Sequence, residues 1–451
     1  MKNVLSGRVT KLALALLLIT PAAVWAQDPK VSYGAPNYWR AYDKSGINVF
    51  ETGKKDDSLV FDGMKIRFGA GFTQQFQNLQ QENGGALNNK GFNKLYPLAP
   101  GFMTAMANLN TDVQLADGIR LSVTTYLSAR HHNEAWVKGG YIQFDKLPFK
   151  AKFWQDLMKV TTIKVGHMEV NYGDAHFRRS DGGQTLYNPF MESYILDGYA
   201  TEIGGEVILQ KNGFFGVGSV TSGMIKGNVD SVAATMQDAN TKRSPSIILK
   251  GGLDKKIGDN LRIRLSGSWY HNGSSAASGL TLYGGDRTGS NYQNVMENAP
   301  AGANLPSSTA IAFSGRLNPG FSKKVDAIML NGFLKAGGLE LFGTFETAKG
   351  RNKTETKVRN IQQYAADVIY RFGHEENLFV GARYNNVKGR LVNMTNDISV
   401  DRIAGAAGWF VTRNILLKGE YVLQNYYSFP STDYRSSGKF KGYVIEAVVG
   451  F

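Results

Sequence analysis

The stretch KFKGYVIEAVVGF, residues 439–451, ends the chain, and every second residue from Tyr443 onward is apolar. Tyr443, Ile445, Ala447, Val449 and Phe451 fall on one face of an extended strand, because successive side chains of a β-strand point to opposite sides. The residues between them form the other face. This period of two predicts a β-strand with one apolar face.

The same period recurs along the whole chain. In MKIRFGAGF, residues 64–72, Met64, Ile66 and Phe68 share one face and Lys65 and Arg67 share the other. About sixteen such segments can be counted, with eighteen as the alternative. Short turns alternate with long connections; the turns include 117–118, 211–213, 336–338 and 412–414, and the long connections include 79–100, 225–243 and 427–438. This alternation predicts an all-β fold, a transmembrane antiparallel β-barrel over residues 59–451. A soluble β-sandwich requires no such alternation.

The composition agrees with many strands joined by tight turns. Of the 451 residues, 12% are aromatic and 52 are glycine. No segment has eighteen consecutive apolar residues, so no helical membrane span is expected. The chain has no cysteine, which excludes disulfides and thiolate metal sites.

Residues 1–26, MKNVLSGRVTKLALALLLITPAAVWA, combine a basic start, a short apolar run and small residues before Ala26. This pattern predicts a secretory signal peptide cut after Ala26, and the short apolar run argues against a membrane anchor. Removing its three cations lowers the formal net charge from +14 to +11. Residues 27–58 are polar and irregular. We expect a periplasmic lead-in there, with packing inside the barrel as the alternative.

The last residue of the chain, Phe451, leads to a prediction about assembly. A terminal Phe that closes an alternating strand resembles the signal by which bacterial outer-membrane barrels are recognised. Phe451 is therefore predicted to be an assembly signal, with the barrel-assembly machinery as a partner and the cell outer membrane as the location.

One long connection, which includes VNYGDAHFRRSDGGQTLYNPF at residues 170–190, has no period and is rich in charge. It follows the fifth strand, so it is the third external loop if the first strand rises from the periplasm. In general porins the loop at this position folds into the lumen, and Gly182 and Gly183 allow the tight turns that this requires. The predicted constriction residues are Arg178, Arg179, Asp174 and Asp181. Alternatively, the arginine pair binds wall acids such as Glu202 or Glu206 and only holds the loop.

Three segments, KVGHMEVNYGD at 164–174, RRSDGGQTLYNPFMESYILDGYATEIGGEV at 178–207 and EAVVGF at 446–451, resemble porins of the phosphate-selective porin O and P family, in its Bacteroidota branch. The resemblance implies a sixteen-stranded barrel, a homotrimer, and a third loop inside the lumen. In anion-selective members of the family, basic residues line the path of the anion.

The strand period also predicts which charges face the lumen. The cations are Lys65, Arg67, Arg120, Arg130, Lys250, Arg262, Arg264, Arg371, Arg383, Arg402 and Lys418, and the acids are Asp112, Glu202, Glu206, Glu340, Glu346, Asp367, Glu420 and Glu446. The two signs nearly balance, whereas a dedicated anion path would be one-sided. Opposed charges across a constriction instead give a transverse field.

These observations favour a porin that allows passive diffusion of small hydrophilic solutes, with some anion preference. Two alternatives remain open: a substrate-specific phosphate or anion channel, and a structural barrel plugged by residues 272–323. Expected partners are outer-membrane lipids, lipopolysaccharide and further copies of the chain.

Other classes of function are disfavoured. No Gly-x-Ser-x-Gly elbow is present, so an enzyme is not expected. His131, His132 and Glu134 lie close in sequence, but they fall in a short external turn where a solvated loop is expected, with no metal and no cofactor. The basic residues are scattered at strand spacing without a stacking aromatic patch, which argues against nucleic-acid binding.

Overall fold

The computed structural model describes residues 30–31, 39–54, 61–84, 94–128, 135–238, 241–275, 279–299 and 313–451. The predicted signal peptide, residues 1–26, lies outside the described residues. So do Arg130, His131, His132 and Glu134.

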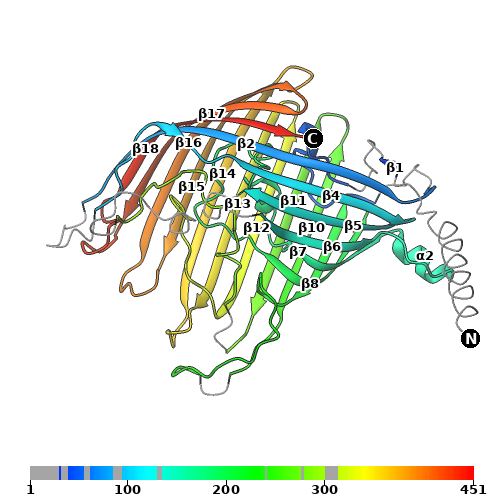
Figure 1. Cartoon of the computed structure of the whole chain (residues 1–451), viewed down its shortest axis with the longest axis horizontal. Helices are drawn as coiled ribbons and strands as arrows, with labels where there is room; N and C mark the ends of the chain where they lie inside the picture. Colours follow the sequence, from blue (N-terminus) through cyan, green and yellow to red (C-terminus); the bar gives the residue numbers. More distant parts are fainter. Residues whose placement is uncertain are drawn as a thin grey trace, which may run out of the picture.

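Sixteen long strands form one closed antiparallel barrel (Figure 1). They are β2 (Lys65–Glu82), β4 (Met106–Ala116), β5 (Ile119–Ser128), β6 (Trp136–Phe144), β7 (Thr161–Glu169), β8 (Thr201–Lys211), β9 (Phe214–Thr221), β10 (Ser246–Ile257), β11 (Leu261–Asn272), β12 (Lys324–Ala336), β13 (Leu339–Arg351), β14 (Arg359–Phe372), β15 (Leu378–Gly389), β16 (Ile398–Thr412), β17 (Ile415–Tyr427) and β18 (Lys439–Gly450). Neighbours in the chain pair with each other, and β18 pairs with β2 to close the cylinder.

Two further strands have two residues each. β1 (Lys30–Val31) pairs in parallel with β2, and β3 (Gly101–Phe102) pairs with β2 in the antiparallel sense. Counting them, the sheet has eighteen strands. The predicted barrel of sixteen strands is therefore confirmed, because the two short strands pair with β2 and add no strand to the cylinder.

The connections alternate in length, as the sequence predicts. At one end of the barrel the strands are joined mostly by short turns, such as 117–118 and 337–338, and at the other end by longer loops, such as 170–200 and 273–323. One connection at the turn end is longer and contains the helix α2 (Lys152–Met158). The sequence did not predict this helix, because one or two helical turns are too short to show a helical period of apolar residues. No helix among the described residues is long and apolar enough to cross a membrane.

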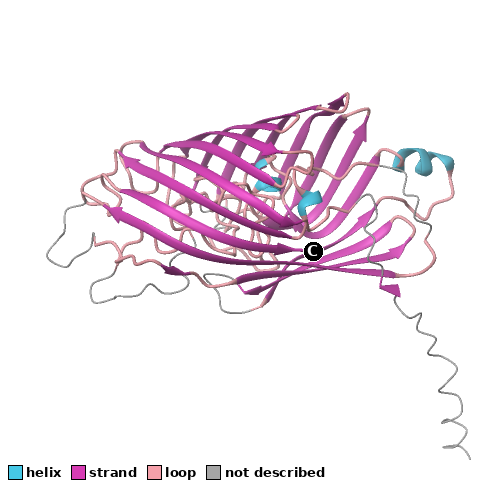
Figure 2. Ribbon diagram, turned by 90° about the horizontal axis from the view of Figure 1, so that it is seen from above, coloured by secondary structure: helices cyan, strands magenta, loops and turns pink. Residues whose placement is uncertain are grey.

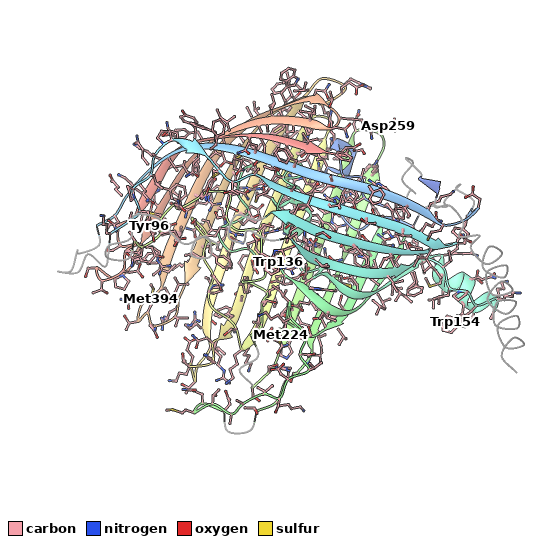
Figure 3. All side chains as sticks on the ribbon, in the orientation of Figure 1. Tyr96, Trp136, Trp154, Met224, Asp259 and Met394 are labelled. Atoms are coloured by element: carbon pink, nitrogen blue, oxygen red, sulfur yellow. The ribbon has the colours of Figure 1, made fainter. Side chains whose placement is uncertain are left out.

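Side chains project from both faces of every long strand (Figure 3). On the outer face, Phe68, Phe72 and Ile445 expose 53%, 45% and 53% of their surface, whereas Thr73 and Glu446 on the inner face are buried. In β14 buried and exposed residues alternate without interruption. The outer wall is thus mainly apolar and the inner wall carries most of the charges, as a barrel between hydrocarbon and a polar lumen requires.

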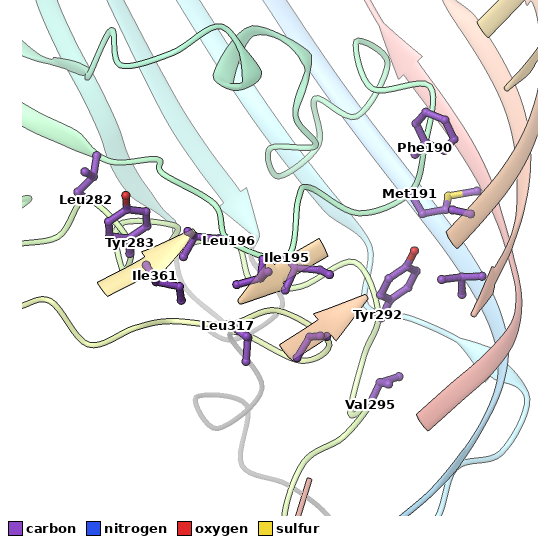
Figure 4. Close-up of a cluster of buried hydrophobic side chains, with 14 of the residues drawn as sticks. Phe190, Met191, Ile195, Leu196, Leu282, Tyr283, Tyr292, Val295, Leu317 and Ile361 are labelled. Carbon is purple, nitrogen blue, oxygen red and sulfur yellow. The ribbon is translucent and has the colours of Figure 1, made fainter. Parts of the chain in front are cut away.

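Two of the long loops fold into the barrel, and Figure 2 shows loop segments between the strand walls. Ile195 and Leu196 of loop 170–200 belong to the same buried apolar cluster as Leu282 and Leu317 of loop 273–323 and Ile361 of β14 (Figure 4). The inward position of the third loop confirms the prediction. The described parts of loop 273–323 add a second inward loop.

Candidate functional site in the barrel lumen

Loop 170–200 is fixed to the wall at β17 by one buried cation. The Lys418 ammonium donates hydrogen bonds to the carbonyl oxygens of Thr185, Asn188 and Phe190 at 3.1, 2.8 and 3.0 Å. It also forms an ion pair with Glu446 at 3.0 Å. A buried ammonium is stable only when its charge and its three donors are all satisfied, and these four partners achieve that.

Further along, the loop is held by amide and guanidinium groups of three consecutive strands. The backbone N–H groups of Ile195 and Leu196 donate to Asn385 of β15 and Gln363 of β14 at 2.7 and 2.9 Å. Arg402 of β16 donates to the carbonyl oxygen of Ser193 at 2.8 Å. An irregular segment needs such partners when it is buried, because its own backbone groups do not pair internally.

The tip of the loop contacts the junction of the first and last long strands. The Thr73 hydroxyl of β2 donates to the carbonyl oxygen of Gly183 at 2.8 Å, and the Thr185 hydroxyl donates to Glu446 of β18 at 2.6 Å. A Cβ atom on Gly183 would lie only 2.2 Å from the carbonyl oxygen of Gly71. Glycine is therefore required at this close approach.

Residues 39–54 lie inside the barrel near the turn end. The Lys44 backbone N–H, in the short 3-10 helix η1 (Lys44–Gly46), donates to the carbonyl oxygen of Arg413 in the turn between β16 and β17 at 2.9 Å. The Arg40 guanidinium donates to the carbonyl oxygen of Phe177 at 2.8 Å and lies 3.7 Å from the Tyr187 ring centroid. This part of the expected lead-in thus packs against the third loop.

Glu51 joins the same segment to the wall. Its carboxylate forms ion pairs with Lys250 of β10 and Arg264 of β11, both at 2.7 Å. Burial alone would raise the pKa of Glu51, but the two cations lower it below its usual range. Asp174 of the loop shares the same two cations at 2.8 and 2.7 Å. Asp174 therefore fastens the loop and does not border the open part of the lumen.

Arg178, at the end of the 3-10 helix η2 (Ala175–Arg178), points at the wall. It donates to the Asn48 amide oxygen and lies 3.8 Å from Glu340 of β13. Its guanidinium carbon is 5.5 and 5.0 Å from the ring centroids of Phe333 and Phe342. The side chain is therefore enclosed between residues 39–54, the loop and the wall.

Arg179 belongs to a cluster that joins the two inward loops. It forms ion pairs with Asp181, Asp197 and Asp286 at 3.0, 2.7 and 2.9 Å. Arg316 of loop 273–323 binds Asp197 and Asp286 as well, at 3.0 and 2.8 Å. Burial would raise the pKa of Asp286, but Arg179 and Arg316 outweigh it and lower that pKa well below its usual range.

A cavity with a volume of about 260 Å³ runs beside β4–β8, between that wall, loop 170–200 and residues 39–54. It extends from Lys138 to Gln143 along β6, which at about 3.4 Å per residue is roughly 17 Å. Its lining includes five cations and four acids, which are Arg40, Arg120, Lys138, Lys164, Arg179, Glu51, Asp112, Glu169 and Asp181. We call this cavity the lumen passage.

The structure brings some of the predicted constriction and lumen residues to this passage and covers others. Arg179, Asp181 and Arg120 border it. The remaining described ones are covered by other partners. Arg67, Lys250, Arg262 and Arg264 contact residues 39–54 or the loop, and Arg371, Arg383 and Lys418 pair with the wall acids Glu340, Asp367 and Glu446. Lys65 pairs with Asp62, Glu202 accepts a hydrogen bond from Tyr270, and Glu206 pairs with Lys164. The alternative predicted for the arginine pair is contact with wall acids such as Glu202 or Glu206; the wall acid nearest Arg178 is Glu340 of β13.

Sequence reasoning missed several residues of the site. Lys138 of β6 borders the passage and forms an ion pair with Asp181. Arg316 and Asp286 complete the arginine–aspartate cluster, and Glu51 links the N-terminal segment to the wall. Only Lys138 carried a signal, since it occupies an inward position of a predicted strand. The other three lie in irregular segments where no period points to a partner.

The described residues contain no group of three or more metal-ligating side chains. A scan with protein-family models finds no match, and a search of curated protein sequences finds none either. Solved structures do match. An anion-selective porin from Comamonas acidovorans has a TM-score of 0.51 at 9% identity, covering 86% of this chain and 100% of that one. The outer-membrane channel DcaP of Acinetobacter baumannii has a TM-score of 0.50 at 10% identity, covering 87% and 99%. The chain thus has the barrel fold of these bacterial porins and channels.

Proposed function

We propose that the protein is a passive porin of the outer membrane, through which small hydrophilic solutes diffuse along the lumen passage. One observation carries the proposal. Between loop 170–200, residues 39–54 and the β4–β8 wall, a cavity lined by charged side chains of both signs remains, and it follows the strands for roughly 17 Å. A channel has to bind its solutes weakly, because conduction needs release as well as entry. The mixed charges of the passage fit that requirement.

An anion preference is part of the proposal, with Arg179 and Asp181 at the constriction. It is supported by the formal net charge and by the small excess of cations along the passage. Within a narrow lumen such charges are screened less than on an open surface. Membership of the phosphate-selective porin O and P family is proposed on the segments 164–174, 178–207 and 446–451, of which the first two include the inward loop.

The proposal also covers the export, assembly and location of the protein. Residues 1–26 serve as the signal peptide, and the mature chain assembles as a homotrimer among outer-membrane lipids and lipopolysaccharide. Phe451 is recognised by the barrel-assembly machinery. Outward aromatic residues near both ends of the barrel, such as Trp409 and Tyr427, which expose 49% and 46% of their surface, suit the two membrane interfaces.

A plugged structural barrel is the second candidate, favoured by the apolar packing of loop 273–323 inside the lumen. Single-channel recording in planar bilayers under a salt gradient separates the two. A porin gives stepwise conductance, and the sign of its reversal potential reports the preferred ion. Absence of conductance from correctly folded protein at any voltage would refute the porin and favour the plug.

A further inference from the structure

A small cavity lies between loop 170–200 and the wall formed by β13–β15. Its volume is about 10 Å³, which is room for one water molecule or one monoatomic ion. Arg178, Arg179, Ser193 and Arg383 border it, and so does Asp197. Of these residues only Arg179 also borders the lumen passage, so the small cavity is a separate feature.

Several donors of the residues that border this cavity have no acceptor. Within the described part of the chain, Nε and Nη2 of Arg178, Nε of Arg179 and Oγ of Ser193 lack hydrogen-bond partners. These three residues are 2%, 5% and 3% exposed, so bulk water does not reach them. A buried donor left unsatisfied costs about 1–3 kcal/mol, and more when it is charged. Four unsatisfied donor atoms on three residues that border one cavity therefore point to an acceptor that is not part of the protein.

The charge balance at Arg178 points the same way. Its nearest acid, Glu340, is 3.8 Å away and is bound more closely by Arg371 at 2.7 Å. Lys335, at 3.7 Å from Glu340, has its own partner in Glu376 at 2.6 Å. One carboxylate thus serves two buried guanidinium groups. A buried charge without a counter-ion is strongly destabilising, so one negative charge is missing here.

The other charges at the cavity are already matched. Arg383 forms an ion pair with Asp367 at 2.7 Å. The Asp197 carboxylate accepts hydrogen bonds from Arg179 at 2.7 Å and from Arg316 at 3.0 Å. Neither supplies the missing charge at Arg178. Burial lowers the pKa of Arg178, as expected for a guanidinium whose charge is incompletely compensated.

We propose that this cavity binds one chloride ion, held by the guanidinium groups of Arg178 and Arg179 and the hydroxyl of Ser193. A halide accepts N–H and O–H donors from several directions and supplies the missing charge. A water molecule supplies no charge, and a cavity of about 10 Å³ excludes phosphate and sulfate. The ion acts as a structural counter-ion behind the third loop, independent of any solute that crosses the lumen passage.

The direct test locates a heavier halide. Wild-type protein is refolded in sodium bromide and crystallised, and the anomalous difference signal of bromide is mapped. A peak within hydrogen-bond distance of the Arg178 guanidinium and Ser193 Oγ supports the proposal. Crystals without a peak there, while other surface sites show bromide, would mean that water fills the cavity, and the proposal would be overturned.

Stability supplies a second, independent readout. A ligand that binds only the folded state multiplies the folding constant tenfold for each tenfold rise in its concentration above its dissociation constant. Wild-type protein refolded in detergent should gain stability from chloride but not from gluconate at equal ionic strength. Ser193→Ala should weaken this gain, whereas Ser219→Ala, a matched buried serine bonded to Glu206 on another wall, should retain it. Arg178→Gln removes the charge and should abolish it. Equal responses of wild type, Ser193→Ala and Ser219→Ala would refute the site even if Arg178→Gln fails to fold.

Discussion

Replacing Lys418 by Met should detach the third loop from the wall without changing the barrel. Methionine keeps the length of the side chain but donates no hydrogen bond. The carbonyl oxygens of Thr185, Asn188 and Phe190 then lose their common donor. Glu446 loses its cation, although it keeps its bonds from Gln75 and Thr185. The strand pairing of β17 is untouched, because the side chain takes no part in it.

The size of the effect follows from these contacts. A hydrogen bond from a charged donor contributes about 1.5–3 kcal/mol, and breaking a buried ion pair costs about 3–5 kcal/mol. The contributions are not additive, so we take about 4 kcal/mol as the loss in docking free energy. Since every 1.4 kcal/mol is a factor of ten, the ratio of undocked to docked loop should rise about a thousandfold.

Single-channel recording is the assay. The Lys418→Met channel should show frequent transitions to a larger conductance, because an undocked loop opens the lumen. Lys164→Met is the matched control, since Lys164 borders the passage but pairs with Glu206 on the neighbouring strand at 3.0 Å. It should shift selectivity toward cations while the current stays quiet. Quiet, wild-type conductance from Lys418→Met would refute the anchoring role.

Three further predictions concern the loops, the end of the chain and the topology. Burial raises the pKa of Glu297 to about 7, so the folded loop holds this proton more tightly than the unfolded chain. The stability that loop 273–323 gains from this proton is complete below pH about 4.5 and is lost as the pH rises to 7. Hydrogen-exchange protection of residues 313–323, corrected for intrinsic rates, should therefore fall over that range in wild type but not in Glu297→Gln. Deleting Phe451 removes two backbone hydrogen bonds to Ala70, so heat-modifiable folded barrel should decrease while synthesis is unchanged; a normal level would contradict the assembly signal. An epitope inserted at 225–238 should be accessible on intact cells and one at 337–338 should not, and labelling at 337–338 would reverse the orientation.

Much of the fold could be predicted because the strand period is local. Each of the sixteen strands shows its alternation within its own ten or so residues, and the same parity places Lys250, Arg383 and Glu446 on the inner face. The third loop was predictable from its position after the fifth strand. Its glycine pair also carried a valid signal, as the close approach of Gly183 to Gly71 shows.

The partners of the loop residues could not be predicted, because they are distant in sequence. Arg178 finds Asn48 across 130 residues, and Arg179 finds Asp286 across 107. No period connects such segments. The inward fold of loop 273–323 left only a weak trace, in single apolar residues such as Leu282 and Leu317 within a polar stretch. These residues become informative only when the partner loop and the wall are placed beside them.

The contact between the loop tip and the two ends of the sheet has a consequence for assembly. Thr73 and Glu446 lie on strands that meet only when the barrel closes, and Gln75 and Glu446 are 371 residues apart in the chain. The tip has no complete docking place before that moment, so loop docking follows closure and cannot lead it. Once docked, the loop tip contacts both strands of this closing pair. Lateral parting of β2 and β18 would first have to displace Gly183 and Thr185, so the loop adds a second fastening where the two ends of the sheet meet.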